Sequence, residues 1–292
     1  MPHSRLASPS ATIAALDRYG LRTRKSLGQH FLIDDNVVGR ILELAAVEPG
    51  ELVLEIGPGI GTLTDALLGV GASVVAVEYD DRLLPGLADL AAEAPGLTVV
   101  HADAVSVPVA ALTTSAGPPV ALVANLPYAV AATVVLRFFE EMPGLSQATV
   151  MVQAEVADRM AAAPATKDYG AYTVKLALRA RVAGRFAVAR SCFLPPPRVD
   201  SAVIRLDRVE QAAAPELVAA ATRVAEAAFS QRRKTIRNSL AAGLGISTSE
   251  GEALLAEAGI EGSVRAETVA VSGYLDLGQA LLEWDAGRPD GG

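Results

Sequence analysis

A glycine-rich stretch near the start of the chain has the spacing of a turn that lets a ligand approach the backbone. It reads EIGPGIGTLT over residues 55–64, with Gly57, Gly59 and Gly61. An apolar run precedes it and a helix-like run follows, so we expect the turn at the end of a strand, where open α/β sheets bind ligands. The dinucleotide pattern G-x-G-x-x-G would need glycine where Thr62 stands, which disfavours a dehydrogenase.

Two acidic residues follow at the ends of the next two predicted strands. Glu78 ends SVVAVE, and Asp103 comes directly after LTVVHA. A carboxylate at the first of these ends can accept hydrogen bonds from both hydroxyls of a ribose, and one at the second can accept from the amine of adenine. In a plainer interpretation the glycines only form a tight turn and the acids only cap strands. The three features in this order favour a nucleoside cofactor without a phosphate group, of which S-adenosylmethionine (SAM) is the common example.

The stretch NLPY, residues 125–128, ends a further apolar run and combines an amide, a proline and an aromatic ring. The Asn125 side chain and a nearby main-chain carbonyl can accept both hydrogens of an NH₂ group. Pro127 donates no hydrogen bond, and Tyr128 offers a face on which a planar base can stack. Accepting both hydrogens of an adenine N6 amine favours the tetrahedral nitrogen that attack on a sulfonium methyl requires, so positioning would do most of the work.

The order of apolar runs predicts the elements that hold these residues. Helix-like segments separate most of the runs, which indicates a mostly parallel sheet covered on both faces, with an antiparallel addition at one edge formed by the last two runs. We expect a Rossmann-like α/β fold of the SAM-dependent methyltransferase type, followed by a smaller all-helical domain. The strands are predicted at 51–56, 73–78, 97–102, 120–124, 148–153, 185–190 and 201–206.

The β pattern stops near residue 208, and the rest of the chain is predicted to be helical. Ser249 and Glu252 have the spacing of a capping box for one of these helices. The expected organisation is a flexible segment 1–20, a SAM-binding domain 21–207, a helical RNA-binding domain 208–285 and a flexible tail 286–292.

The charge of the chain is segregated, although its net value of −8 would disfavour a polyanionic partner. Residues 208–240 carry six basic and three acidic residues, whereas residues 50–150 carry two and eleven. Local fields rather than net charge decide where a nucleic acid docks, and clustered solvated faces are the plainer alternative. Cys192 is the single cysteine, and no spacing of His, Cys and carboxylates predicts a metal site. We expect a soluble, cytoplasmic protein with no metal and no membrane partner.

Six stretches together resemble the KsgA/RsmA family of bacterial small-subunit rRNA adenine dimethyltransferases. NLPY is of the Asn/Asp-Pro-Pro-Tyr type that amino-methyltransferases share. The matches extend over most of the chain, and those at its two ends are more specific than the glycine loop. They are KSLGQHFLID (25–34), VLEIGPGIGTLT (53–64), NLPY (125–128), KDYGAYTV (167–174), FLPPPRVDSAVIRL (193–206) and FSQRRKTIRNSL (229–240).

The resemblance implies site residues. Besides the Gly59 and Gly61 of the loop, the implied cofactor contacts are His30, Leu32, Gly57, Glu78, Asp103 and Asn125. The implied target pocket consists of Asn125, Leu126, Pro127 and Tyr128, with Phe193 stacking on the other face of a flipped base. The implied RNA phosphate contacts are Arg232, Arg233, Lys234 and Arg237, with Arg22, Arg24 and Lys25 as a second patch. The chain departs from the family at His30, where Asn is usual, and at residues 129–131, which read Ala-Val-Ala.

The implied function is SAM-dependent dimethylation of two adjacent adenosines near the 3′ end of small-subunit rRNA, in the assembling small ribosomal subunit. Related large-subunit rRNA methyltransferases that confer macrolide resistance share the glycine loop and an Asn-x-Pro-Tyr element. The stretches 193–206 and 231–239 favour the small-subunit enzyme. A mainly non-catalytic assembly factor is a further alternative, which the intact glycine loop and NLPY disfavour.

Overall fold

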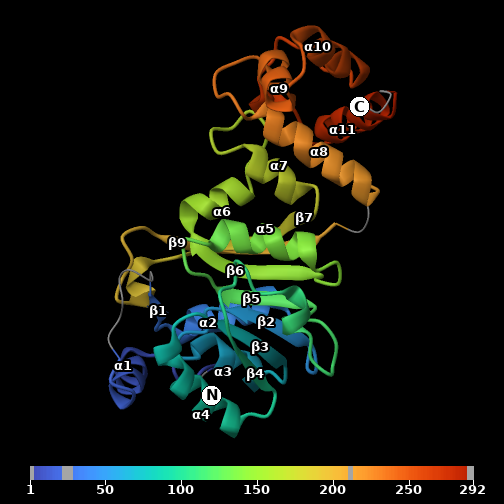
Figure 1. Cartoon of the computed structure of the whole chain (residues 1–292). Helices are drawn as coiled ribbons and strands as arrows, with labels where there is room; N and C mark the ends of the chain where they lie inside the picture. Colours follow the sequence, from blue (N-terminus) through green and yellow to red (C-terminus); the bar gives the residue numbers. More distant parts are fainter. Residues whose placement is uncertain (1–2, 22–28, 210–212, 288–292) are drawn as a thin grey trace. The chain divides into compact units, whose positions relative to one another are not determined.

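In this computed structural model of the protein, residues 3–21, 29–209 and 213–287 are described. Two compact units are distinguished, one of residues 1–157 and 182–208 and the other of residues 158–181 and 209–292 (Figure 1). The strands are β1 (Phe31–Leu32), β2 (Leu52–Ile56), β3 (Ser73–Glu78), β4 (Leu97–His101), β5 (Ala121–Asn125), β6 (Gln147–Gln153), β7 (Ala180–Val188), β8 (Phe193–Leu194) and β9 (Ser201–Arg208). The helices are α1 (Pro9–Arg18), α2 (Asp35–Ala45), α3 (Thr62–Gly69), α4 (Leu84–Glu93), α5 (Ala131–Glu141), α6 (Ala154–Met160), α7 (Ala171–Ala177), α8 (Pro215–Ala228), α9 (Ile236–Leu244), α10 (Thr248–Glu257) and α11 (Val271–Ala286).

A seven-stranded sheet in the order β4-β3-β2-β5-β6-β9-β7 forms the centre of the first unit. The strands from β4 to β6 run parallel, and β9 pairs antiparallel to β6 with Gln153 opposite Ser201. The expected fold class, a mostly parallel sheet with an antiparallel addition at one edge and a helical C-terminal region, is confirmed. Parallel strands place their carboxyl ends together, so the turns after β2, β3, β4 and β5 meet at one edge of the sheet.

Both faces of strands β2, β3, β5 and β6 are buried, which explains why these strands are nearly continuous apolar runs. One hydrophobic cluster joins α2 and α3 to alternate strand residues, among them Val74 and Ala76. The intervening Val75 and Val77 are also buried, with exposed fractions of 1% and 2%. The five predicted strands that correspond to β2, β3, β4, β5 and β6 match the observed bounds to within one residue at each end.

The position of β7 was predicted less well. The apolar pattern suggested 185–190, but the strand covers Ala180–Val188. Most of its side chains are exposed, including that of Val182, because β7 lies at the edge of the sheet. An exposed edge strand has no continuous apolar run by which its ends could be recognised.

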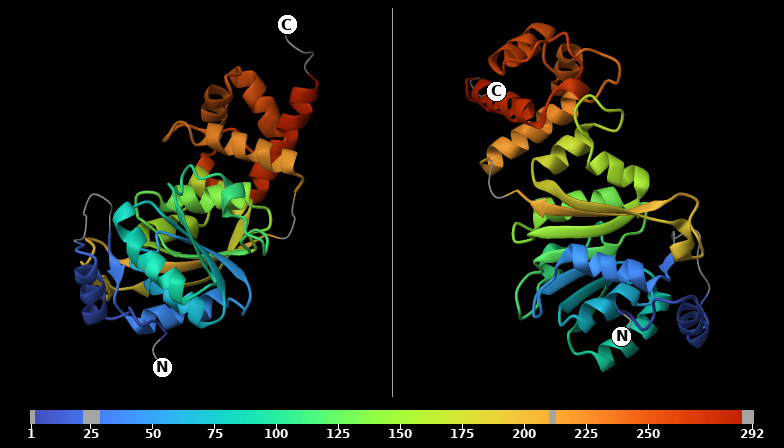
Figure 2. Two further views of the ribbon diagram at one scale, coloured as in Figure 1. Left: turned by 60° about the horizontal axis from the view of Figure 1, so that its bottom comes forward. Right: turned by 180° about the vertical axis from the view of Figure 1, so that it is seen from behind.

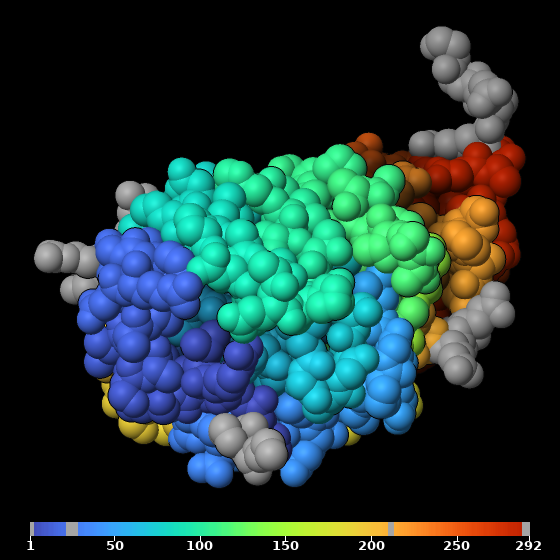
Figure 3. Space-filling view, turned by 90° about the horizontal axis from the view of Figure 1, so that it is seen from below, coloured from blue at the N-terminus to red at the C-terminus, as the bar shows by residue number. Residues whose placement is uncertain are grey.

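The segment 1–20, which was expected to be flexible, contains helix α1 in its described part, and its flexibility stays a prediction. Helix α1 begins after Ser8, whose Oγ accepts from the Ala11 N–H at 3.2 Å. The segment is anchored further by Arg5, which donates to the Asp65 carboxylate at the start of α3 at 2.7–3.0 Å. Figure 3 shows these dark blue residues against later parts of the same unit.

The second unit has a helical core of its own (Figure 2). Buried residues of α7, α8, α9, α10 and α11 form one cluster around Tyr274, which is fully buried. Residues 158–181, which the sequence analysis assigned to the first domain, belong to this unit. The capping box of α10 pairs Ser247 with Glu250, and the predicted pair Ser249–Glu252 is wrong.

Within the described ranges, no helix is long and apolar enough to cross a bilayer. Residues 104–136 carry no charged side chain, but they include a 3-10 helix at Val109–Leu112, β5 and the first half of α5. Residues 3–21, 29–209 and 213–287 contain no group of three or more His, Cys, Asp or Glu residues that could hold a metal ion.

We predict that Gly243→Ala destabilises the helical unit. Alanine normally favours a helix over glycine by about 1 kcal/mol. At this position, however, a Cβ atom would clash with the Ala227 backbone of α8 and lie 2.8 Å from its carbonyl oxygen. The expected net loss in the free energy of unfolding is about 2 kcal/mol. Urea unfolding followed through the fluorescence of Trp284, the single tryptophan, measures it. The neighbouring exposed substitution Ala242→Ser is the control, and a stabilised Gly243→Ala variant would refute the packing argument.

Candidate functional site

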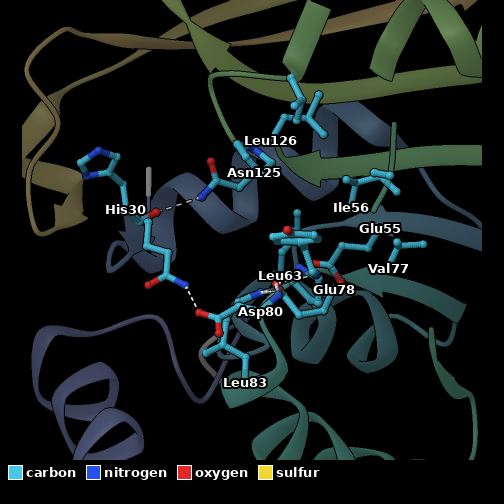
Figure 4. Close-up of a pocket in the computed structure, with 18 of the residues that line it drawn as sticks. His30, Glu55, Ile56, Leu63, Val77, Glu78, Asp80, Leu83, Asn125 and Leu126 are labelled. Atoms are coloured by element: carbon cyan, nitrogen blue, oxygen red, sulfur yellow. Dashed lines mark hydrogen bonds between the residues drawn. The ribbon is translucent and has the colours of Figure 1, made fainter. Parts of the chain in front are cut away.

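A cavity of about 320 Å³ lies at the carboxyl ends of the central strands (Figure 4). The turns after β2 and β3, the residues that follow β4, and the NLPY stretch after β5 all line it. Ten of the predicted site residues come together here, namely His30, Leu32, Gly57, Gly59, Glu78, Asp103, Asn125, Leu126, Pro127 and Tyr128. Gly61 and Phe193 are not among the lining residues.

The glycine loop is packed too closely for side chains. Gly57 has a φ of 68°, and a Cβ atom there would lie 3.3 Å from the ring of Pro127. Gly59 has a φ of 63°, and its Cβ atom would lie 3.0 Å from Phe31. The loop therefore passes between the NLPY stretch and β1 with its backbone exposed to the cavity. Gly61 ends the loop as the N-cap of α3 and does not line the cavity.

The Glu78 carboxylate is held in place by backbone N–H groups. Its Oε1 accepts from Tyr79 at 2.9 Å and from Asp80 at 2.8 Å, and its Oε2 accepts from Gly59 at 3.2 Å. Burial raises the pKa of this carboxyl, and the backbone hydrogen bonds partly offset the effect. Because Oε2 accepts one of these bonds and Oε1 two, Oε2 retains capacity for a hydroxyl donor in the cavity.

Asp103 lies at the exposed rim of the cavity and has one oxygen committed to its own turn. Oδ1 accepts from the Val105 N–H at 2.8 Å, an interaction typical of aspartate in turns. Among the described residues, no donor contacts Oδ2. This oxygen can accept a hydrogen bond from a ligand.

Three features of the cavity were not predicted from the sequence. The Asp80 carboxylate accepts from Gln29 Nε2 at 2.7 Å and from Arg82, and the Arg82 guanidinium lowers the pKa of that carboxyl. Tyr79 lines the cavity and is 64% exposed. The Thr62 Oγ1 is buried and has no hydrogen-bond partner in the described part of the chain. These residues were missed because each depends on a contact or an exposure that spacing alone does not reveal.

Glu55, to which the sequence analysis gave no role, is a buried acid beneath the glycine loop. It is 1% exposed, and its Oε2 accepts from Thr64 Oγ1 at 2.6 Å. Burial raises the pKa of Glu55 to about 8, despite the opposing effect of the Thr64 hydrogen bond. Glu55 is therefore largely protonated and neutral at pH 7.

The NLPY stretch presents two acceptors. Asn125 Nδ2 donates to the His30 carbonyl at 3.2 Å, and a carbonyl can only accept, so the orientation of the amide is determined. Its Oδ1 remains available, as does the Leu126 carbonyl, since no described donor contacts either oxygen. The Tyr128 hydroxyl is hydrogen-bonded to Ser201 Oγ at 2.7 Å, and burial raises the pKa of this phenol.

Phe193, the predicted second stacking ring, is not brought to the cavity. It is 2% exposed and belongs to the hydrophobic cluster of α2. Its strand, β8, pairs antiparallel with β1, with Leu32 opposite Phe193. Pairing between two strands of two residues each leaves too short a pattern for recognition in the sequence.

The predicted cationic residues fall into two groups. Arg22, Arg24 and Lys25 lie outside the described residues. Arg232, Arg233 and Lys234 are exposed in the turn between α8 and α9, where Arg233 has a φ of 83°. Arg237 in α9 is also exposed and lies 3.6 Å from Glu252.

Comparison with known proteins identifies the family. The model of the family "Ribosomal RNA adenine dimethylase" matches residues 20–281. The chain belongs to the ribosomal RNA adenine dimethylase family. One similar protein, "Ribosomal RNA small subunit methyltransferase A" from Phenylobacterium zucineum, is 44% identical to this chain over 92% of this chain and 91% of its own length. The protein of the same name from Rhodococcus opacus is 45% identical over 93% of both chains.

Solved structures agree with this family assignment at the level of the fold. A dimethyladenosine transferase from Plasmodium falciparum has a TM-score of 0.70 at 23% identity and covers 88% of this chain and 98% of its own. The 23S rRNA methyltransferase ErmE has a TM-score of 0.63 at 29% identity and covers 86% and 99%. The small-subunit relatives are thus much more similar in sequence to this chain than ErmE is.

We predict that Glu55 makes stability fall as pH rises. The folded state keeps the Glu55 proton up to about pH 8, whereas the carboxyl of the unfolded chain loses it near 4.5. Between these values the folded state binds more protons, so the free energy of unfolding decreases with pH by roughly 1 kcal/mol per pH unit. Glu55→Gln removes this contribution and keeps an acceptor for Thr64. Urea unfolding of both proteins from pH 5 to pH 8 measures the difference, and parallel pH profiles would contradict the assignment.

Proposed function

We propose that the protein transfers methyl groups from SAM to the N6 amines of two adjacent adenosines near the 3′ end of small-subunit rRNA. The proposed setting is the assembling small ribosomal subunit, in the cytoplasm. The observation that carries the proposal is the convergence of two sets of groups on one cavity. Carboxylates and a glycine turn suited to a nucleoside lie on one side, and the Asn125 and Leu126 oxygens suited to an amine lie on the other.

The cofactor side fits SAM in size and in polar groups. A cavity of about 320 Å³ is within the usual range for small-molecule sites. We assign a ribose hydroxyl to Glu78 Oε2 and the adenine amine to Asp103 Oδ2, with the Gly57 and Gly59 backbone close to the ligand. The unpartnered Thr62 hydroxyl adds a polar group at the start of α3. The cofactor supplies a methyl group on a positively charged sulfur, which makes that carbon electrophilic.

The target side needs no strong base. The lone pair of an adenine N6 amine is delocalised into the ring, so the free amine is a poor nucleophile. Hydrogen bonds to Asn125 Oδ1 and to the Leu126 carbonyl hold both N–H groups out of the ring plane and release the lone pair. Tyr128 supplies the stacking surface, while the ring of Pro127 fixes the backbone φ angle between Leu126 and Tyr128. A monomethylated amine keeps one N–H, so one acceptor suffices for the second transfer.

Phe193 is not assigned to the base pocket in this proposal. Its ring is buried in the core, and stacking on a base would require it to leave the cluster of α2. The four exposed cations of residues 232–237 are proposed to bind rRNA phosphates, because their exposure allows close approach to a polyanion. Arg22, Arg24 and Lys25 remain a second predicted patch.

A large-subunit substrate is the alternative that the resemblance to ErmE raises. It is not favoured, because identity to ErmE is 29% whereas identity to the small-subunit relatives is 44–45% over at least nine-tenths of both chains. A purely non-catalytic assembly factor would not need both acceptors of the NLPY stretch and the held Glu78 carboxylate.

We predict that labelled SAM gives N6,N6-dimethyladenosine in unmethylated small ribosomal subunits and not in large subunits. Asn125→Ala should reduce the rate at least a hundredfold, because it removes an acceptor that fixes the amine, as expected for the loss of a group that stabilises the transition state. Nucleoside mass spectrometry identifies the product, and calorimetric titration with S-adenosylhomocysteine tests whether the cofactor side is intact in the variant. Product in the large subunit alone would overturn the proposal.

We predict that Lys234→Ala weakens binding to small subunits without changing affinity for the cofactor. Loss of one phosphate contact should lower the slope of log affinity against log salt by about 1. Filter binding at several salt concentrations measures this slope. The control is Arg223→Ala, which removes an exposed cation of the same helical unit that is ion-paired with Asp285 at 3.1 Å. Equal effects of both substitutions would show that the turn before α9 has no special role.

A further inference from the structure

The His30 residue contacts three parts of the active cavity that come from distant places in the sequence. Its backbone carbonyl accepts from Asn125 Nδ2 at 3.2 Å. Its ring lies against the ring of Tyr128, with centroids 5.6 Å apart and planes inclined by 27°. Its Nδ1 is 2.8 Å from the Pro195 carbonyl oxygen. One residue thus touches both ends of the NLPY stretch and the chain that follows β8.

The contact with Pro195 determines the direction of the His30 ring. A carbonyl oxygen accepts and does not donate, so Nδ1 carries the proton in this contact. Figure 4 shows the ring turned away from Glu78 and Asp80. The side chain therefore points away from the residues that we assign to the cofactor.

The contact with Tyr128 completes the fixation of that ring. Its hydroxyl is bonded to Ser201 Oγ at 2.7 Å, and its face is covered by His30 in an offset-stacked arrangement. A tyrosine held at its hydroxyl alone could still rotate about the axis through that oxygen. Stacking removes this freedom and sets the plane of the surface on which a base would lie.

The backbone of His30 is itself fixed on both sides. The preceding Gln29 donates to Asp80 Oδ2 at 2.7 Å. The following β1 pairs with β8, with Phe31 opposite Leu194. The carbonyl that orients Asn125 is consequently part of a segment held on both sides. The contact of the His30 ring with Pro195 adds a side-chain hydrogen bond next to the pairing of β1 with β8.

We propose that His30 is a positioning residue for the target adenosine, which sets the plane of Tyr128 through its ring and the orientation of Asn125 through its carbonyl, and that its side chain is not a ligand of the cofactor. The proposal rests on the proposed function, because it concerns binding of the base in the same cavity. It assigns to a side chain of this sequence a role separate from the contact with SAM that the family resemblance implied.

The first test separates the target side from the cofactor side. His30→Ala keeps the carbonyl but removes the ring, whereas His30→Phe keeps a stacking ring and removes the donor to Pro195. We expect kcat on small subunits to fall about threefold to tenfold in His30→Ala and less in His30→Phe, consistent with the strength of an aromatic pair. The dissociation constant of S-adenosylhomocysteine should stay within twofold in both. A rise of more than fivefold in that constant, with kcat unchanged at saturating SAM, would overturn the proposal.

The second test does not depend on activity. In protein labelled with ¹³C in its six tyrosine rings, the signal of Tyr128 is assigned through Tyr128→Phe. Loss of the neighbouring His30 ring should shift and sharpen this signal in His30→Ala. The control is His3→Ala, because the His3 ring packs on Gly39 of α2 and not on the cavity. An unchanged Tyr128 signal would refute the stacking role. If the Tyr128 signal shifts in His30→Ala but the wild-type protein methylates no ribosomal subunit, the proposed function fails and the positioning of Tyr128 by His30 stands.

Thermal unfolding of each variant accompanies both tests. A variant that unfolds before 37 °C is replaced by His30→Gln, which keeps a polar side chain of similar length but no ring. His30→Gln should then behave like His30→Ala in the Tyr128 signal and in kcat. If a folded His30→Gln variant has the wild-type Tyr128 signal and the wild-type kcat, the proposed role of the His30 ring is refuted.

Discussion

The hydrogen bond from the Gly59 N–H to the Glu78 carboxylate joins the turn after β2 to the end of β3, and the shape of the cavity depends on it. A main-chain hydrogen bond from the Gly57 N–H to the Val77 carbonyl, at 2.9 Å, joins the same loop to β3 one residue earlier. The carboxylate also caps the chain that leaves β3, since it accepts from Tyr79 and Asp80. One buried acid therefore shapes both walls of the nucleoside side. The energetic cost of burying it, evident in its raised pKa, is partly offset by the three backbone donors that surround it.

The features that could be predicted from the sequence are those with a local cause. The apolar runs of β2 to β6 identified the sheet, because a strand buried on both faces carries few polar residues. The acids Glu78 and Asp103 were placed correctly at the cavity because the carboxyl ends of parallel strands meet at one edge. The glycine turn was also found from spacing alone.

The features that were missed depend on contacts between distant residues. The helix near the start of the chain and its anchoring were not expected, because the Ser- and Pro-rich composition resembles a tail, yet Arg5 binds Asp65. Phe193 was expected in the pocket but is buried, since pairing of β8 with β1 turns it toward α2. The contact of His30 with Pro195 joins residues 165 positions apart, and no periodicity reports such a pair.

The anchoring of the N-terminal segment has a consequence for the order of folding during synthesis. Residues 3–21 are made before the groups that hold them, because Asp65 follows Arg5 by 60 residues and Glu93, which also binds Arg5, by 88. At translation rates of about 5–20 residues per second, the second of these partners is made roughly 4–18 s after Arg5. During that interval the buried face of α1, including Leu16, has no surface to cover it. The segment that is made first therefore cannot complete these contacts until α3 and α4, which carry its two partners, have been made.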